Sequence, residues 1–156
     1  MRLVLFQPDI APNAGSLLRL GACLGVPIDI VEPCGFVFSD AQMRRAGMDY
    51  LEHADFVRHA SWDAYLAQLA KGRIVLVTSK GDMPYTNFAF EPDDNIVLGR
   101  ESAGAPQFVH DRAEARLRIP LKSGLRSINV AQAGAMVVGE ALRQTGTFPE
   151  MKMGPR

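Results

Sequence analysis

The sequence predicts an α/β fold with a mainly parallel sheet flanked by helices. Short runs rich in valine, isoleucine and leucine are continuous rather than alternating, which is typical of strands buried on both faces of a parallel sheet. Segments with helical spacing of apolar residues lie between these runs, and such alternation of strands and helices indicates parallel pairing. The expected strands are Leu3–Phe6, Ile28–Val31, Ile74–Val77, Ile96–Leu98 and Leu117–Leu121.

Three segments are expected to form helices. Residues 16–24 and residues 62–70 carry apolar side chains three or four positions apart, as one face of a helix requires. Residues 128–142 are apolar or small almost all round, which is typical of a helix buried in a core or in an interface. In a chain of this length we expect a subunit interface, and Ser127 precedes the segment as a candidate N-cap.

Length and composition indicate one globular domain that spans residues 1–156. Of these 156 residues 47% are hydrophobic, so the chain can bury a core without disulfides or metals. No apolar run approaches the roughly 18 residues of a membrane span, and the N-terminal segment turns polar too early for a signal peptide. We therefore expect a cytoplasmic protein with no membrane partner and a flexible tail over about residues 147–156.

Charge and cysteine content argue against several classes of protein. The 17 basic and 17 acidic side chains give zero net charge, which disfavours a protein that holds nucleic acid by bulk electrostatics. Cys23 and Cys34 are not in a C-x-x-C arrangement, so we expect two reduced thiols. No set of histidine, cysteine and acidic residues has zinc spacing, so no metal is expected.

Three loop-like segments follow predicted strands and carry the unusual polar residues. Ligands of open α/β sheets bind beyond the carboxyl ends of the strands, so the position alone makes these segments candidate sites. The first segment, Gln7–Arg19, is explained structurally as a turn with Asn13 or Ser16 as a helix cap. Arg19 does not fit that explanation, because an arginine among leucines needs a carboxylate, a phosphate or solvent.

The second and third segments also admit plain structural explanations. In Asn95–Pro106, two glycines flank Glu101, which suits either a close approach of backbone to a ligand or a tight turn with a solvated carboxylate. The segment Arg118–Asn129 is basic and leads to Ser127 at a helix start. Free backbone N–H groups at such a start favour an anion or a polar ligand, although an ordinary capped helix has the same pattern.

Taken together, the three segments resemble the three motifs of the SpoU branch of the SPOUT methyltransferases. The match runs along nearly the whole chain and involves Asn13, Gly15 and Arg19, then Leu98, Gly99, Glu101 and Gly104, then Ile119, Pro120, Leu121, Ser127, Ile128, Asn129 and Val130. No separate RNA-binding domain is visible. Residues 32–50 and the segment Thr78–Gly81 are similar to the small TrmL-type tRNA (cytidine/uridine-34)-2′-O-methyltransferases.

This resemblance implies features that periodicity and composition do not reveal. Members of the family carry a deep trefoil knot in the C-terminal part, bind S-adenosylmethionine in a bent shape without a metal, and work as homodimers. The C-terminal helix is therefore expected in the dimer interface. Carried over by motif, the residues expected to contact the cofactor are Val77, Gly99, Ile119, Leu121 and Ser127.

The implied reaction is methyl transfer to the ribose 2′-hydroxyl of wobble nucleotide 34, a cytidine or modified uridine, in leucine tRNAs. The resemblance assigns the catalytic roles to Arg19 and Ser127. Arginine is a poor base, so we expect Arg19 to orient a phosphate or the 2′-oxygen and to stabilise developing negative charge. Asn13 and Asn129 are expected to position these groups, and Glu101 is expected either to orient Arg19 or to cap a loop.

The expected macromolecular partner is the anticodon stem-loop of tRNA. Basic residues that could contact it, or equally form a solvated surface, are Arg44, Arg45, Lys80, Lys122 and Arg126. The zero net charge then predicts a modest, salt-sensitive affinity that comes from a local patch. The alternatives are 2′-O-methylation of another tRNA position or of rRNA, and an RNA-binding module without catalysis.

Overall fold

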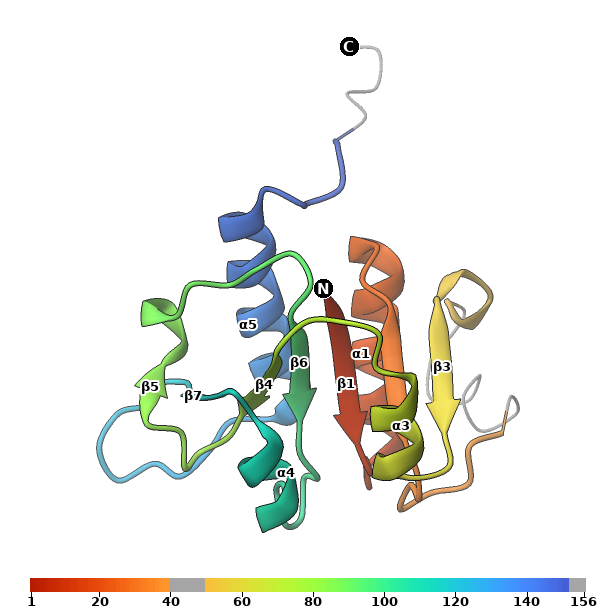
Figure 1. The fold of residues 1–156 in the computed structure, drawn as a ribbon, viewed down its shortest axis with the longest axis horizontal. Coiled ribbons are helices and arrows are strands. Elements are labelled where there is room, and N and C mark those ends of the chain that lie inside the picture. The colour runs from red at the N-terminus through yellow and green to blue at the C-terminus, as the bar shows by residue number, and fades with distance from the viewer. Residues whose placement is uncertain (40–49, 152–156) are drawn as a thin grey trace.

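The computed structural model describes residues 1–39 and 50–151. Within them, seven strands form one sheet in the order β3-β2-β1-β6-β4-β7-β5, and every neighbouring pair is parallel (Figure 1). The predicted α/β architecture is therefore confirmed. The strands are β1 (Arg2–Phe6), β2 (Ile28–Val31), β3 (Phe56–His59), β4 (Ile74–Val77), β5 (Met83–Pro84), β6 (Asn95–Leu98) and β7 (Ala115–Arg118).

Differences from the predicted strands occur mainly at the edges of the sheet. The strands β3 and β5 were not predicted, because β3 leaves Val57 and Arg58 exposed and β5 has only two residues. The predicted strand Leu117–Leu121 is wrong at its end, since β7 stops at Arg118. Pro120 lacks a backbone N–H and restricts the residue before it, so the strand ends ahead of the proline.

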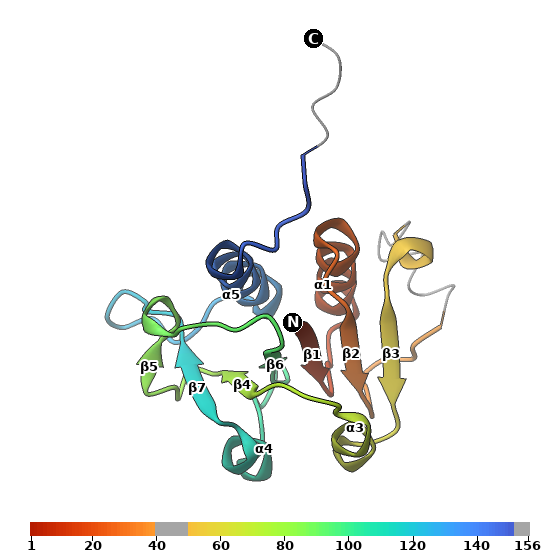
Figure 2. The same cartoon turned by 45° about the horizontal axis from the view of Figure 1, so that its top comes forward.

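Four helices are described, and they cover both faces of the sheet. They are α1 (Ala11–Leu24), α3 (Trp62–Gln68), α4 (Gln107–Arg112) and α5 (Val130–Thr145), with short 3₁₀ turns at Leu51–His53 and Tyr85–Asn87. Figure 2 shows α1 and α5 together on one face of the sheet, and α3 and α4 on the opposite face. Among the described residues, no helix is long and apolar enough to cross a membrane.

The starts of the two long helices differ from the prediction. The helix α1 begins at Ala11, five residues before the predicted start, with Pro12 in its first turn, where proline is well tolerated. Asn13 and Ser16 therefore lie inside α1 and do not cap it. The predicted cap Ser127 is also wrong, because the cap of α5 is Asn129, whose side chain accepts hydrogen bonds from backbone N–H groups of the first turn.

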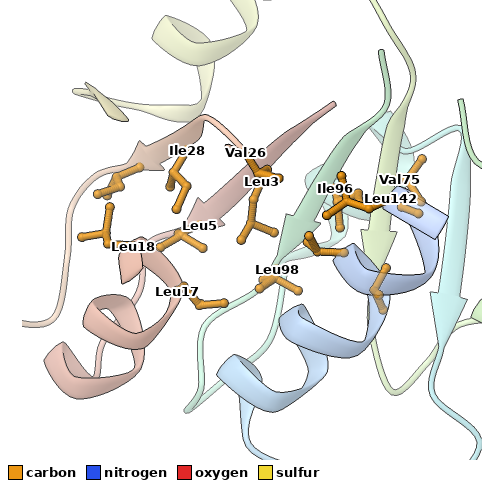
Figure 3. Close-up of a cluster of buried hydrophobic side chains, with 14 of the residues drawn as sticks. Leu3, Leu5, Leu17, Leu18, Val26, Ile28, Val75, Ile96, Leu98 and Leu142 are labelled. Atoms are coloured by element: carbon orange, nitrogen blue, oxygen red, sulfur yellow. The ribbon is translucent and has the colours of Figure 1, made fainter. Parts of the chain in front are cut away.

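The larger core lies between the sheet and the pair α1 and α5 (Figure 3). Leu17 of α1 and Leu98 of β6 enclose Gly134 of α5, where an added Cβ would lie 2.7 Å from Leu17 Cδ2 and 2.9 Å from Leu98 Cδ1. The small residue lets α5 approach closely. One face of α5 is thus buried within the chain, while Met136 on that helix is 41% exposed. A second core on the other face contains Trp62 of α3.

The chain leaves two neighbouring strands in opposite directions. After β1 it enters α1 on one face of the sheet, and after the adjacent β6 it enters α4 on the other face (Figure 2). Loops that diverge in this way open a crevice at the carboxyl ends of the strands, and ligands of α/β proteins bind at such a point. A ligand site is therefore expected at the carboxyl ends of β1 and β6 and of the nearby strands β4 and β7.

Candidate active site

A cleft of about 800 Å³ lies at this carboxyl edge, within the size range of small-molecule sites. Its walls come from the ends of β4, β6 and β7 and from the loops that follow them. Apolar side chains and backbone of the segment before α5 form one side. All five residues predicted to contact the cofactor line it, namely Val77, Gly99, Ile119, Leu121 and Ser127.

Backbone hydrogen bonds close the loop after β6 into a tight turn, and the conformation of this turn requires its two glycines. The backbones of Arg100 and Gly104 hydrogen-bond to each other, with N···O distances of 3.2 and 2.9 Å, and Gly104 has a φ of +66°. A Cβ at Gly99 would lie 2.6 Å from Ala105 N and 2.6 Å from Gly104 C. Backbone cannot yield as a flexible side chain can, so this turn needs glycine at both ends.

Hydrogen bonds join one residue from each of the three segments. Glu101 Oε1 accepts from Asn13 Nδ2 at 3.2 Å, and Asn13 Oδ1 accepts from Asn129 Nδ2 at 2.9 Å. Asn129 Oδ1 in turn accepts from Ala131 N at 2.8 Å and so caps α5. Two roles were left open for Glu101, orienting Arg19 or capping a loop, and these contacts are of the second kind.

Asp9 belongs to this network, although the sequence analysis did not select it. Its carboxylate accepts from Glu101 N at 3.1 Å and from the hydroxyl of Ser102, while Asp9 N donates to Glu101 Oε2 at 3.0 Å. Hydrogen bonding, first to Glu101, lowers the pKa of Asp9 to about 2. Burial, assisted by the neighbouring Asp9, raises the pKa of Glu101. Asp9 follows β1 by three residues and Glu101 follows β6 by three, so both lie at the same edge of the sheet, but no local pattern in the sequence indicates that they pair.

The structure separates Arg19 from the other predicted catalytic residues. Asn13, Glu101, Ser127 and Asn129 line the cleft, but Arg19 does not. Arg19 is exposed on α1, and its guanidinium carbon lies 4.5 Å from the centre of the Tyr50 ring. A 3.5 Å hydrogen bond from Arg19 Nη2 to the Tyr50 hydroxyl accompanies this stacking.

Cations without a carboxylate partner gather around the cleft. Within residues 1–39 and 50–151, six side chains are of this kind, and five of them lie at or beyond the carboxyl ends of β4, β6 and β7. The predicted RNA contacts Arg44 and Arg45 lie outside the described residues. The six cations are Arg19, Lys80, Arg100, Arg118, Lys122 and Arg126, of which Arg100, Arg118 and Arg126 line the cleft.

The arrangement of the fold and site defines a class of protein. It is an α/β protein with a cleft of small-molecule size at the carboxyl edge of its sheet, beside cations that attract anions. Both cysteines are free, and the described part of the chain contains no group of three or more histidine, cysteine or acidic side chains that could hold a metal ion. The family model of the SpoU rRNA methylases matches residues 1–139, and the chain belongs to this family.

Relatives and solved structures match nearly the whole chain. A protein of Beijerinckia indica named tRNA (cytidine(34)-2′-O)-methyltransferase is 53% identical over 156 residues, which cover 99% of this chain and 98% of the relative. An Escherichia coli protein of the same name is 36% identical, with 94% of each chain covered. A structure described as giving insights into the 2-OH methylation of C/U34 on tRNA has a TM-score of 0.87 and 37% identity, and the match covers 92% of this chain and 94% of that one.

A structure of an rRNA methyltransferase from Sinorhizobium meliloti with bound AdoMet shares the fold. Its TM-score is 0.80 at 24% identity, and the match covers 91% of this chain and 55% of that one. At this identity the likeness concerns the fold alone. The matching region is the α/β unit itself, since nearly half of the longer chain lies outside it.

Proposed function

We propose that this chain transfers a methyl group from S-adenosylmethionine to the ribose 2′-hydroxyl of nucleotide 34 of tRNA, a cytidine or a modified uridine. The observation that carries the proposal is the hydrogen-bonded link from Glu101 through Asn13 to Asn129, which joins all three family segments at one cleft. The names of the relatives supply nucleotide 34 of tRNA as the substrate. Leucine isoacceptors are proposed from the resemblance of residues 32–50 and of Thr78–Gly81 to the TrmL type.

The residues around the cleft suit S-adenosylmethionine. Val77, Ile119 and Leu121 offer apolar contact, and the backbone of Gly99 also lines the cleft. Together with Ser127 these residues would hold the cofactor. When bound, S-adenosylmethionine supplies an electrophilic methyl group on a sulfonium. Because the methyl group is already electrophilic, the site needs a cleft of matching shape and backbone contacts to the cofactor, and it does not need a metal to activate the methyl group.

The polar residues of the cleft are proposed to orient the acceptor hydroxyl. The Asn13 amide is held from both sides, because Glu101 accepts from its Nδ2 and Asn129 donates to its Oδ1. An amide fixed in this way, in the same cleft as the exposed Ser127, would present fixed hydrogen-bonding groups to a ribose, and such positioning lowers the entropic part of the barrier.

Arg19 is proposed to stabilise developing negative charge or to orient a phosphate from outside the cofactor cleft. Arg19→Ala should abolish methyl transfer, because it removes the proposed stabilisation of negative charge. The affinity for S-adenosylmethionine should stay within about twofold of the wild type, because Arg19 does not line the cleft. Isothermal titration calorimetry and a methyl-transfer assay measure the two effects separately. Full transfer activity in this variant would contradict the role given to Arg19.

The unpaired cations support binding of RNA despite the zero net charge. Lys122 and Arg126 precede α5, Lys80 follows β4, and Arg118 ends β7, so the positive charge is concentrated at one edge. Cations already paired with carboxylates contribute little to phosphate binding, whereas these are available for it. We propose that they contact the anticodon stem-loop.

We also propose that the chain acts as one methyltransferase domain in a homodimer formed through α5, with the trefoil knot of the family. One sheet includes every described strand, which supports a single domain. Support for the dimer comes from the outer side of α5, where Met136 and Ala135 are exposed. The knot is proposed from membership in the SpoU family. We propose that the activity is cytoplasmic, because tRNA is the proposed substrate.

A labelling experiment tests the proposed function. The purified protein is incubated with methyl-labelled S-adenosylmethionine and, in separate reactions, with total tRNA and with rRNA. The proposal predicts label in tRNA and none in rRNA. Label only in rRNA would favour the alternative suggested by the family description, and no label in either RNA, with cofactor bound, would favour a silent RNA-binding module.

A further inference from the structure

Three loops at the carboxyl edge of the sheet meet at Asp9. The loop after β6 contacts it through Glu101 and Ser102, whose backbone N–H groups both donate to its carboxylate, at 3.1 and 3.4 Å. The loop after β2 presses against it through Gly35, where an added Cβ would lie 2.5 Å from Asp9 Cβ. Gly35 N also donates to Pro8 O at 2.9 Å.

The contacts between Asp9 and Glu101 run in both directions. Asp9 accepts from the backbone of Glu101, and the backbone of Asp9 donates to the side chain of Glu101. This reciprocal pairing holds the Glu101 carboxylate where Asn13 can donate to it. Asp9 therefore stands at the start of the hydrogen-bonded chain that ends at the first turn of α5.

We infer that Asp9 is a positioning residue, which holds the turn from Glu101 to Gly104 in the shape that binds the cofactor. The inference rests on the proposed function and names a residue beyond it. Asp9 does not line the cleft, so it acts through the turn and not by touching the ligand. Gly99 and Gly104, which close the turn, have no side chains to stabilise it, and the carboxylate of Asp9 supplies hydrogen bonds that they cannot.

The test compares Asp9→Asn with the wild type. Asparagine keeps the size of the side chain but removes its charge. Its amide also replaces one accepting oxygen with an N–H donor, which cannot accept from the backbone N–H groups of Glu101 and Ser102. The dissociation constant of S-adenosylmethionine should rise about tenfold or more, as expected for loss of one charge-assisted hydrogen bond. The KM for S-adenosylmethionine should rise with it, while the KM for tRNA stays within about twofold. The control is Asp111→Asn, since Asp111 is exposed on α4 and, among the described residues, accepts a hydrogen bond only from Gln107 in the same helix.

The outcomes separate the inference from the proposed function. An unchanged affinity of Asp9→Asn for S-adenosylmethionine would overturn the inference, whether or not the wild type methylates tRNA. A wild type that binds the cofactor but transfers no methyl group would overturn the proposed function and leave the binding comparison valid. Equal rises in KM for both substrates would indicate general disorder of the site and would also overturn the inference.

A second variant decides the matter if Asp9→Asn does not fold. Ser102→Ala removes one donor to Asp9 and keeps the carboxylate and both backbone contacts. Its affinity for S-adenosylmethionine should fall about two- to fivefold with an unchanged melting temperature, because a single exposed contact is lost. Wild-type affinity in Ser102→Ala would then count against the positioning role.

Discussion

Asn129 has two separable roles, because its two amide atoms serve different partners. Its Oδ1 accepts from Ala131 N at 2.8 Å and from Gln132 N at 3.4 Å, which caps α5. Its Nδ2 donates to Asn13 Oδ1 at 2.9 Å, which links α5 to α1. Replacement by alanine removes both contacts, whereas replacement by serine keeps a good N-cap and removes only the link.

The expected magnitudes follow from these contacts. Loss of the cap in Asn129→Ala should cost about 1 kcal/mol, which corresponds to a fall of roughly 2–4 °C in melting temperature for a domain of this size. Asn129→Ser should melt within about 1 °C of the wild type. Of the described contacts of the Asn13 amide, both variants leave only the one with Glu101, so both should lose about tenfold in kcat, the equivalent of about 1.4 kcal/mol of transition-state stabilisation.

Two assays separate the roles. Differential scanning fluorimetry measures the melting temperatures, and transfer of labelled methyl to tRNA under saturating cofactor measures kcat. Wild-type kcat in Asn129→Ser would refute the positioning of Asn13 by Asn129. An unchanged melting temperature in Asn129→Ala would refute the capping role, and a loss of kcat in the alanine variant alone would show that only helix capping matters.

Four further outcomes are expected. Gly99→Ala should weaken binding of S-adenosylmethionine at least tenfold, because the new Cβ meets the backbone of the turn. An unchanged affinity, measured by isothermal titration calorimetry, would contradict this. The pKa of Asp9 is lowered from 3.8 to about 2, so its contribution to the free energy of unfolding is present above pH 3.8 and is lost as the pH falls toward 2. When the free energy of unfolding is measured against pH, Asp9→Asn should lack the loss of stability that Asp9 causes in this range. In Arg118→Gln the slope of log affinity for tRNA against log salt should shrink by about 1, while Arg143→Gln, whose guanidinium already pairs with a carboxylate, should keep the wild-type slope. Met136→Glu should turn a dimer into a monomer in light scattering, and a dimeric variant would exclude α5 as the interface.

The parallel sheet and the cleft could be predicted because both follow from local patterns. Continuous apolar runs marked the inner strands, and the polar segments that come directly after them necessarily meet at one edge of a parallel sheet. For this reason Gly99, Ile119 and Ser127 were correctly expected near one another, and all three line the cleft. The edge strands escaped prediction because a half-exposed or very short strand has no strong apolar pattern.

The positions of Arg19 and Asp9 could not be predicted from local patterns. Arg19 stacks on Tyr50, which is 31 residues away in the chain, so its distance from the cleft depends on tertiary packing. Asp9 pairs with Glu101, 92 residues away, and nothing near Asp9 in the sequence indicates that pairing. The cap of α5 differs in kind, since Ser127 and Asn129 are both good caps and only the position of the first turn decides between them.

The distribution of charge is compatible with the proposed binding of RNA by a neutral chain. Over the described residues, acidic side chains pair with cations away from the cleft, as in the contacts of Arg73 with Asp94 and of Arg143 with Glu140. The cations at the cleft edge have no such partner in the part of the chain that the structure describes. Net charge therefore understates the local potential, and the salt dependence of binding is the quantity that measures it.

Mapping of the methylated nucleotide tests the central claim most directly. Total tRNA is methylated by the protein with deuterated S-adenosylmethionine, digested with ribonuclease and analysed by mass spectrometry of the fragments. The account predicts one deuterated methyl group on the ribose of nucleotide 34, and no such group when Arg19→Ala replaces the wild type. A label on a base, or on the ribose of any other nucleotide, would contradict it.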